Sequence, residues 1–129
     1  MVAIEFGVVA SVLMVMLIGA TDLGFAMRHR SQMEGAVRAG IQEAMKGGTA
    51  TAIEDAVLAS TDLPSSSEPA VTATKVCYNE TAETTDCSGG SVKSIYMEIT
   101  LQQDHQWLLG FPGFSNPAVL TITKSVRTG

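Results

Sequence analysis

The sequence predicts an α+β fold in which one long N-terminal helix packs, through its second half only, against a small antiparallel sheet. Residues 1–21 carry a single charged side chain, Glu5, whereas the remaining chain is rich in Thr, Ser, Gly and acidic residues. Apolar side chains then recur at helical spacing up to residue 46 and at alternate positions after residue 71. A chain of 129 residues with 46% hydrophobic content has room for one modest domain.

The first element is an apolar helix, because the segment from Val2 to Ala20 contains no charge other than Glu5. About 20 helical residues at 1.5 Å each are enough to cross a bilayer core. A cleaved secretory signal would begin with Lys or Arg and end in small residues, but this segment begins with apolar residues and continues into a polar helix. We therefore predict a membrane-spanning helix half rather than a signal peptide.

The helix is predicted to become amphipathic after Asp22 and to end at about residue 46, before Gly47-Gly48. Glu34 and Arg38 are spaced to form an i,i+4 pair on its polar side. Five apolar side chains are predicted to share the opposite face: Met33, Val37, Ile41, Ala44 and Met45.

A short second helix is predicted over residues 51–61. The Thr51-x-x-Glu54 spacing is that of a capping box, and Ile53, Ala56 and Val57 provide one apolar face. The segment from Pro64 to Pro69 has the composition of a surface linker.

An antiparallel sheet of about three strands is predicted within residues 71–127. Alternation is clear in Ile95, Met97, Ile99 and Leu101, is repeated in Leu120, Ile122 and Val126, and is weaker in residues 71–78. Three short strands with one apolar face need a partner, and the amphipathic half of the long helix is the available one. The aromatic segment Gln103–Pro117 is interpreted as a loop that packs on the domain or on a neighbouring subunit, the alternative being a partner-binding loop.

Cys77 and Cys87 are predicted to close a small disulfide loop in an oxidising compartment, since the segment around them is polar and turn-rich. Two unlinked buried thiols are the alternative, and the spacing matches no zinc pattern. Asn79-Glu80-Thr81 fits the acceptor pattern for N-linked glycosylation, so Asn79 is a possible modification site.

The chain contains no catalytic motif of the GxSxG, GxxxxGK or HExxH type. His29 and His105 lie far apart in the sequence and are each predicted to be surface histidines, so we expect no catalytic residue, metal or cofactor. The net charge of -5 argues against nucleic acid as a primary partner. The basic cluster Arg28-His29-Arg30 is interpreted as a membrane boundary or a solvated helix surface.

Glu5 needs a partner, because an ionised carboxylate inside hydrocarbon costs several kcal/mol unless it is paired or reaches the interface. The nearest suitable cation is an α-amino group, either the chain's own or that of an adjacent copy. A free amine at Met1 against Glu5 of a neighbour would satisfy both charges and fix the stagger between subunits. The alternative is that Glu5 reaches the bilayer edge.

The N-terminal residues Met1-Val2-Ala3-Ile4-Glu5-Phe6 resemble the mature N-terminus of type IV pilins, with glutamate at the fifth position. The chain is similar in particular to TadE-like pilins of the tight-adherence (Tad) pilus. Ile4-Glu5-Phe6-Gly7 matches that family's opening motif, Gly19–Gly24 matches its G-x-x-D/E-F-G-like signature, and residues 120–127 resemble its last strand. Ser11 stands where these proteins often carry proline, and we interpret Met1 as the first residue of an already processed chain.

The resemblance implies a structural, non-enzymatic pilin. Residues 1–24 would lie in the cytoplasmic membrane and then in the filament core, and residues 25–129 would form the globular domain. A prepilin peptidase and pilus assembly machinery would be its partners, and an adhesive extracellular homopolymer its product. Met1, Glu5 and Phe6 would act in assembly, and Gly7, Gly19 and Gly24 would let helices approach closely. A monomeric membrane-anchored binding domain and a secretion-system pseudopilin are the alternatives.

Overall fold

The structure is a computed structural model that describes residues 2–61, 69–79, 83–88, 92–108 and 117–129, with side chains from residue 4 onward. Two helices, α1 (Val2–Met45) and α2 (Ala50–Ala59), are followed by four strands. These are β1 (Ala70–Tyr78), β2 (Glu83–Thr84), β3 (Ser94–His105) and β4 (Ala118–Arg127). The predicted α+β fold is confirmed, with one more strand than expected because the two-residue β2 adds an edge to the sheet.

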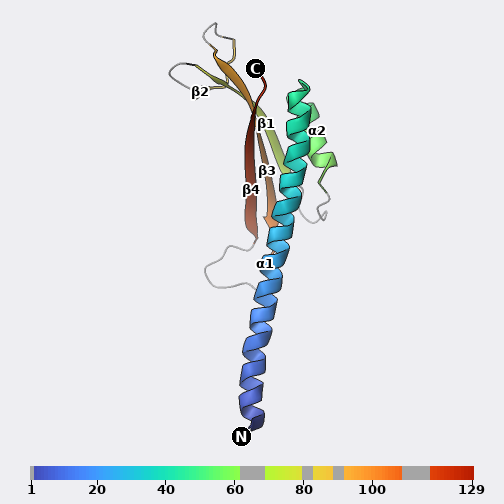
Figure 1. The fold of residues 1–129 in the computed structure, drawn as a ribbon, viewed down its shortest axis with the longest axis vertical. Coiled ribbons are helices and arrows are strands. Elements are labelled where there is room, and N and C mark those ends of the chain that lie inside the picture. Colours follow the sequence, from blue (N-terminus) through green and yellow to red (C-terminus); the bar gives the residue numbers. More distant parts are fainter. Residues whose placement is uncertain (1, 62–68, 80–82, 89–91, 109–116) are drawn as a thin grey trace.

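Helix α1 is one continuous element whose two halves have different surroundings (Figure 1). Its first half projects away from the rest of the chain, and its second half lies beside the sheet and α2. Met33, Val37 and Ala44 are buried as predicted, but Met45 is 62% exposed. Each helical residue advances by about 100°, so Met45 is turned away from the face that Ala44 buries.

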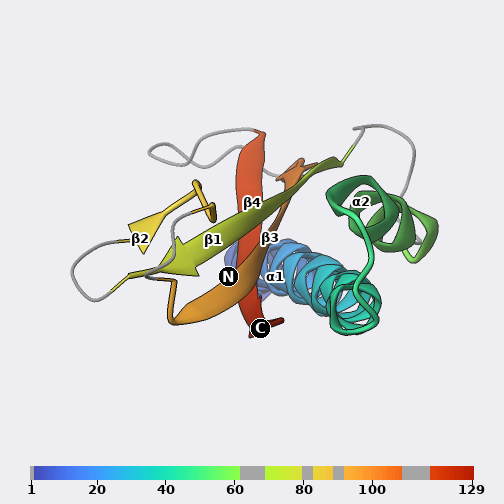
Figure 2. The ribbon, with the colours of Figure 1, turned by 90° about the horizontal axis from the view of Figure 1, so that it is seen from above.

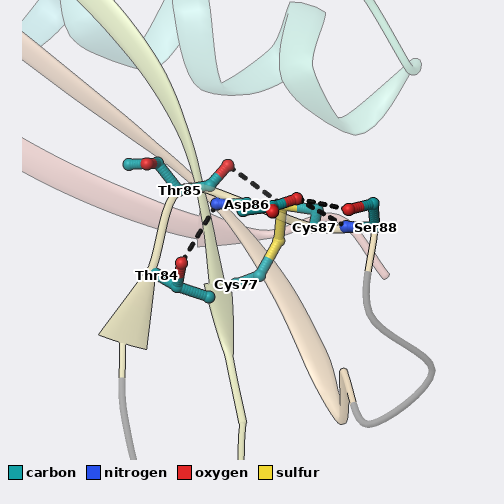
Figure 3. Close-up of a disulfide and its surroundings, with 6 residues drawn as sticks. All are labelled: Cys77, Thr84, Thr85, Asp86, Cys87 and Ser88. Atoms are coloured by element: carbon teal, nitrogen blue, oxygen red, sulfur yellow. Dashed lines mark hydrogen bonds between the residues drawn. A yellow bond between two sulfur atoms is a disulfide. The ribbon is translucent and has the colours of Figure 1, made fainter.

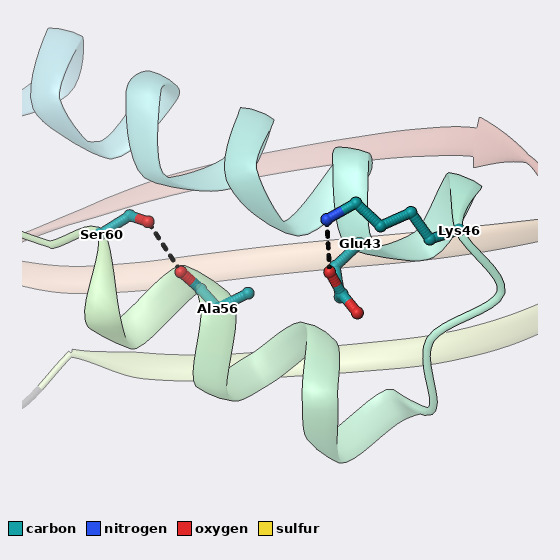
Figure 4. A network of polar contacts seen from close by, with 4 residues as sticks. All are labelled: Glu43, Lys46, Ala56 and Ser60. Carbon is teal, nitrogen blue, oxygen red and sulfur yellow. Dashed lines mark hydrogen bonds and ion pairs between the residues drawn. The ribbon is translucent and has the colours of Figure 1, made fainter.

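The second half of α1 differs from the prediction in its surface ion pairs. Glu34 pairs with Arg30, at 3.7 Å between Arg30 Nε and Glu34 Oε1, instead of with Arg38. Near the end of α1, Lys46 Nζ lies 3.1 Å from Glu43 Oε2 (Figure 4). Both pairs are solvent-exposed, so each contributes little to stability. Gly47, with a φ of 83°, then adopts the left-handed conformation that ends the helix.

Helix α2 begins two residues earlier than the capping box predicted. Thr49 is its N-cap, and the Ala52 N–H donates to Thr49 Oγ1 at 3.3 Å. Thr51 therefore lies inside the helix, and the Thr51–Glu54 capping box is wrong. Glu54 instead accepts a hydrogen bond from the Ala73 N–H of β1 at 3.0 Å, which ties α2 to the sheet. At the other end, Ser60 Oγ donates to the Ala56 carbonyl at 2.8 Å (Figure 4).

The sheet is antiparallel, with strand order β2-β1-β3-β4. Its register places Ala73, Ile99 and Lys124 side by side, and one face of β1 and β3 covers α1 and α2 (Figure 2). That face and the helices enclose the core: Met33, Ala36, Val37, Ala44, Ile53, Val57, Ala73, Met97, Ile99, Leu101 and Ile122. The alternating residues predicted to face inward are thus the ones that do.

Gly40 is the glycine of α1 whose missing side chain the core requires. A Cβ built at Gly40 would lie 2.5 Å from Val57 Cγ2 and 3.3 Å from Ile99 Cδ1. Val57 is β-branched and fully buried, so it has little freedom to move aside. Gly40 therefore allows α1 to approach α2 and β3 closely.

Candidate functional site

The first half of α1 presents an apolar surface on all sides. Ile4 and Phe6 are 76% and 74% exposed, and large side chains remain exposed as far as Met27. None of the most apolar window of this helix is buried inside the subunit, and the helix is long and apolar enough to cross a membrane. A helix that is apolar all round is stable in lipid or against other proteins, not in water. We call the exposed residues 4–21 the projecting segment.

The two hydroxyl groups of the projecting segment form hydrogen bonds within the helix. Ser11 Oγ donates to the Val8 carbonyl at 2.7 Å, and Thr21 Oγ1 donates to the Leu17 carbonyl at 2.8 Å. Hydroxyl groups bonded in this way are tolerated in hydrocarbon because no donor is left unpaired. Helix α1 runs through Ser11 without a break.

The three glycines predicted to serve helix packing face open space in the subunit. A Cβ at Gly7, Gly19 or Gly24 would meet nothing within 4 Å. Packing against the described residues therefore does not require a glycine at these three positions, in contrast to Gly40. Their predicted role in contacts between copies remains a prediction.

Glu5 lies on the exposed surface near the tip of the projecting segment. Among the residues that the structure describes, Glu5 has no salt-bridge partner. Met1 lies outside the described residues, so its pairing with Glu5 stays a prediction, as does the assembly role of Phe6. Arg28 and Arg30 are exposed at the opposite end, just beyond the apolar segment.

Asp22 marks the point where α1 enters the folded domain, and it is only 3% exposed. Its Oδ1 accepts a hydrogen bond from the Leu108 N–H at 3.0 Å, although the two residues are 86 positions apart. The acidic residue of the Gly19–Gly24 signature therefore holds the chain that follows β3 against the helix. The sequence pattern marks Asp22 only as the boundary of the apolar segment and gives no sign of this contact.

The two histidines also meet where α1 enters the folded domain, a region that we call the junction. This contact corrects the prediction that both are separate surface residues. His105 Nδ1 lies 3.3 Å from His29 Nδ1, and His105 is 3% exposed. His105 is also the last residue of β3, not part of a loop, because the strand continues past residue 102. The His105 ring contacts Trp107 edge to face, with ring centroids 4.7 Å apart.

Two patterns in the sequence place each histidine on the core-facing side of its own element, although neither pattern shows that the two rings meet. Asp22, His29 and Met33 are spaced by seven and four residues, which places them on one side of a helix. Gln103 and His105 continue the alternation of Ile99 and Leu101, and both are buried. The apolar faces predicted for α1 and β3 contain no polar side chains, so they do not include these residues.

Burial and neighbouring charges lower the pKa of one of the two histidines. Partial desolvation lowers the pKa of His29 below its ordinary value, and His105 and Arg28 lower it further. A protonated His29 would face another imidazole and a guanidinium. When both rings are neutral, the Nδ1 of one ring can donate a hydrogen bond to the Nδ1 of the other.

Cys77 and Cys87 form the predicted disulfide, with Cα atoms 5.6 Å apart (Figure 3). The bond ties the end of β1 to the segment after β2. Asp86 orders this segment, because its Oδ1 accepts a hydrogen bond from the Ser88 N–H at 3.1 Å. The Asp86 N–H itself donates to Thr84 Oγ1 at 3.1 Å. The neighbouring glycosylation motif is not tested, since Glu80 and Thr81 lie outside the described residues.

Within the described part of the chain, no group of three His, Cys, Asp or Glu side chains could hold a metal ion. The aromatic segment is described only at its ends. Trp107 packs on His105, Leu108 is exposed, and residues 109–116, including Phe111 and Phe114, lie outside the described residues.

A projecting apolar helix half, continuous with an amphipathic half that packs against a small antiparallel sheet, is the architecture of a pilin-like protein. Residues 1–42 match the sequence model of TadE-like proteins, and both motifs that carry the resemblance lie inside this range. The match confirms the predicted resemblance for this part of the chain and relates it to a structural, pilus-associated family. No curated protein and no solved structure matches the chain. The likeness of β4 to the family's last strand lies outside the match and stays a prediction.

Proposed function

We propose that this protein is a structural pilin subunit that polymerises through the projecting segment into a Tad-type pilus used in surface adhesion. The observation that carries the proposal is the exposure of the apolar side chains of residues 4–21, since none of the most apolar window of this helix is buried inside the subunit. A segment of this kind needs an apolar environment. In the cytoplasmic membrane that environment is lipid, and in the filament it is the same segment of other subunits.

The length of the projecting segment fits both environments. Its 18 residues span about 27 Å at 1.5 Å each, close to the thickness of a bilayer core. Residues 1–24 would form the membrane-spanning and filament-core half, and residues 25–129 the domain on the filament surface. The disulfide suits an exported domain, because disulfides persist in oxidising compartments.

Glu5 would be the residue that aligns one subunit with the next. In a core that excludes water, a carboxylate is tolerated when a positive group meets it, and the amino group at Met1 of an adjacent copy is the candidate. A prepilin peptidase would expose that amino group, and the assembly machinery would move the subunit from lipid into the filament.

Substitution of Glu5 tests the proposal in cells that express the full chain. Glu5→Ala should abolish the filaments seen by negative-stain microscopy, with the chain identified in sheared material by mass spectrometry. Glu34→Ala is the matched control, since it also removes a carboxylate from α1 but from an exposed ion pair beside the domain. It should leave filaments intact.

The outcomes separate the alternatives. Wild-type chains that stay monomeric in the membrane and never enter sheared filaments would favour the anchored binding domain. Short fibres that remain within the cell envelope would favour the pseudopilin. Filaments of normal length from Glu5→Ala cells would contradict the role given to Glu5.

A further inference from the structure

The outer face of the sheet, which points away from α1, contains a shallow depression of about 440 Å³. It lies over neighbouring positions of all four strands, since three pairs of the register connect them: Tyr78 with Glu83, Val76 with Tyr96 and Glu98 with Ser125. Alternate residues of these strands face the core, so the depression lies on the solvent side. Its lining is Val76, Tyr78, Glu83, Ser94, Tyr96, Glu98 and Ser125. We call it the tyrosine pocket.

Two aromatic rings form the walls of the tyrosine pocket. Tyr78 and Tyr96 are arranged edge to face, with ring centroids 5.2 Å apart and an interplanar angle of 80°. Rings set nearly at right angles make a corner in which a small group can contact both. The faces of aromatic rings carry partial negative charge and attract cations.

Two carboxylates add full negative charge to the same corner. Partial desolvation raises the pKa of the Tyr78 hydroxyl, and the charge of Glu83, the hydrogen bond to its carboxylate and the charge of Glu98 raise it further. Within the described part of the chain, neither carboxylate belongs to an ion pair. Arg127 is opposite Tyr96 in the register but uses its Nε to donate to the Gly129 carbonyl at 3.1 Å. No ion pair among the described residues neutralises the two carboxylates, and Glu83 also accepts a hydrogen bond from the Tyr78 hydroxyl.

We propose that the tyrosine pocket binds an alkylammonium group of the trimethylammonium or choline type. Its methyl groups would lie against the tyrosine rings, and its charge would be balanced by Glu83 and Glu98. An anion would be repelled by both carboxylates, and a neutral molecule of the same shape would gain nothing from them. A metal ion does not fit, because it needs more ligands than the described residues bring together here.

The position of the pocket gives it a use that rests on the proposed function. The outer face of the sheet points away from the helix that would form the filament core, so every subunit would display the pocket on the filament surface. A single exposed site of this kind binds weakly, with a Kd on the order of 1–10 mM. Many copies along one filament would bind a surface rich in such groups far more tightly.

The two pocket tyrosines are the only tyrosines in the chain, so selective labelling reports on the pocket alone. We would label the tyrosine rings of the full chain with ¹³C, in maltoside micelles that contain no ammonium headgroup, and titrate choline. Saturable shifts of both ring signals are expected. The neutral isostere 3,3-dimethylbutan-1-ol, which has the same shape without the charge, should bind at least about tenfold more weakly.

Matched variants assign the binding to the two carboxylates. Glu83→Gln and Glu98→Gln should each weaken choline binding several-fold, and the double variant about tenfold or more. Asp55→Asn removes the same charge from α2, outside the pocket, and should leave the affinity unchanged. Near-UV circular dichroism of each variant confirms that the fold is retained.

Two results would overturn the proposal: equal shifts with choline and its isostere, or Gln variants that bind as tightly as the wild type. Because the titration uses dispersed subunits, it stands or falls independently of filament formation. Phosphatidylcholine vesicles and free choline, each added to isolated filaments, then distinguish a membrane headgroup from a free ligand. Retention on vesicles that free choline reverses identifies the headgroup, and binding of free choline alone identifies a soluble ligand.

Discussion

The two halves of α1 belong to one unbroken helix, yet they solve the problem of apolar surface in different ways. In the second half, apolar residues form one stripe, and the sheet and α2 bury it. In the first half, apolar residues surround the helix, and a single small sheet could cover only one side of it. The subunit thus buries the narrow apolar stripe of the second half. The apolar surface that surrounds the first half is left for lipid or for other copies.

The glycines of the two halves show the same contrast. Gly40 lies where Val57 and Ile99 leave no room for a side chain, whereas Gly7, Gly19 and Gly24 face open space. A glycine costs about 1 kcal/mol in a helix relative to alanine, so its presence needs a reason at each position. The reason at Gly40 is within the subunit, and at the other three we place it between subunits.

The largest expected effect comes from comparing a leucine of the core that covers the second half of α1 with a leucine of the projecting first half. Leu101 is fully buried against α1, so Leu101→Ala should lower the free energy of unfolding by about 2–5 kcal/mol. Leu13 is exposed, so Leu13→Ala should change the free energy of unfolding by less than about 0.5 kcal/mol. The same substitution should weaken filament assembly. The free energy of unfolding is measured by urea denaturation of the full chain in micelles, followed by near-UV circular dichroism. Similar losses at both positions would show that the projecting segment packs within its own subunit.

A smaller effect is expected from adding a methyl group at two glycines of the packed half. Gly40→Ala should destabilise the chain by about 1–3 kcal/mol, because its Cβ would overlap Val57. Gly35→Ala is the control on the exposed side of the same helix, where a Cβ meets nothing within 4 Å. It should stabilise the chain by about 0.5–1 kcal/mol through helix propensity. Two variants of equal stability would contradict the close approach at Gly40.

The smallest expected effect is a dependence on pH at the junction between the halves. The pKa of His29 is lowered in the folded state, so the unfolded chain binds a proton more readily and folding loses stability as pH falls below about 6.5. The stability is fully present above that value. His29→Gln should flatten this part of the pH profile, as measured by thermal unfolding at pH 5 to 8. An unchanged profile in the variant would exclude His29 as its source.

Much of the fold could be predicted because its signals are local and periodic. The long helix, the short α2, the inward faces of β3 and β4 and the Cys77–Cys87 pair follow from spacing that the chain carries in short segments. The local errors have two causes: neighbouring residues can compete for one role, and an element can be too short to show a period. Thr49 competes with Thr51 for the cap, and β2 is too short to show a period.

The junction is the clearest case of a site that spacing alone could not assemble. Asp22 meets Leu108, and His29 meets His105, only because the antiparallel β3 ends beside the middle of α1. The tyrosine pocket is similar, since Tyr78 and Tyr96 become neighbours through the register of β1 and β3. Neither contact can be read from one segment.

The sequence by itself determined that the chain has an apolar helix half, an amphipathic half and alternating strands, because these depend on which side chains are apolar and how they are spaced. The tertiary structure decided which polar groups meet, how closely the helices approach at Gly40 and which surface of the sheet is left outside. Those features depend on register and on packing between distant segments. Side-chain periodicity records which face of an element is apolar, whereas the identity of the element that covers it is set only when the chain folds.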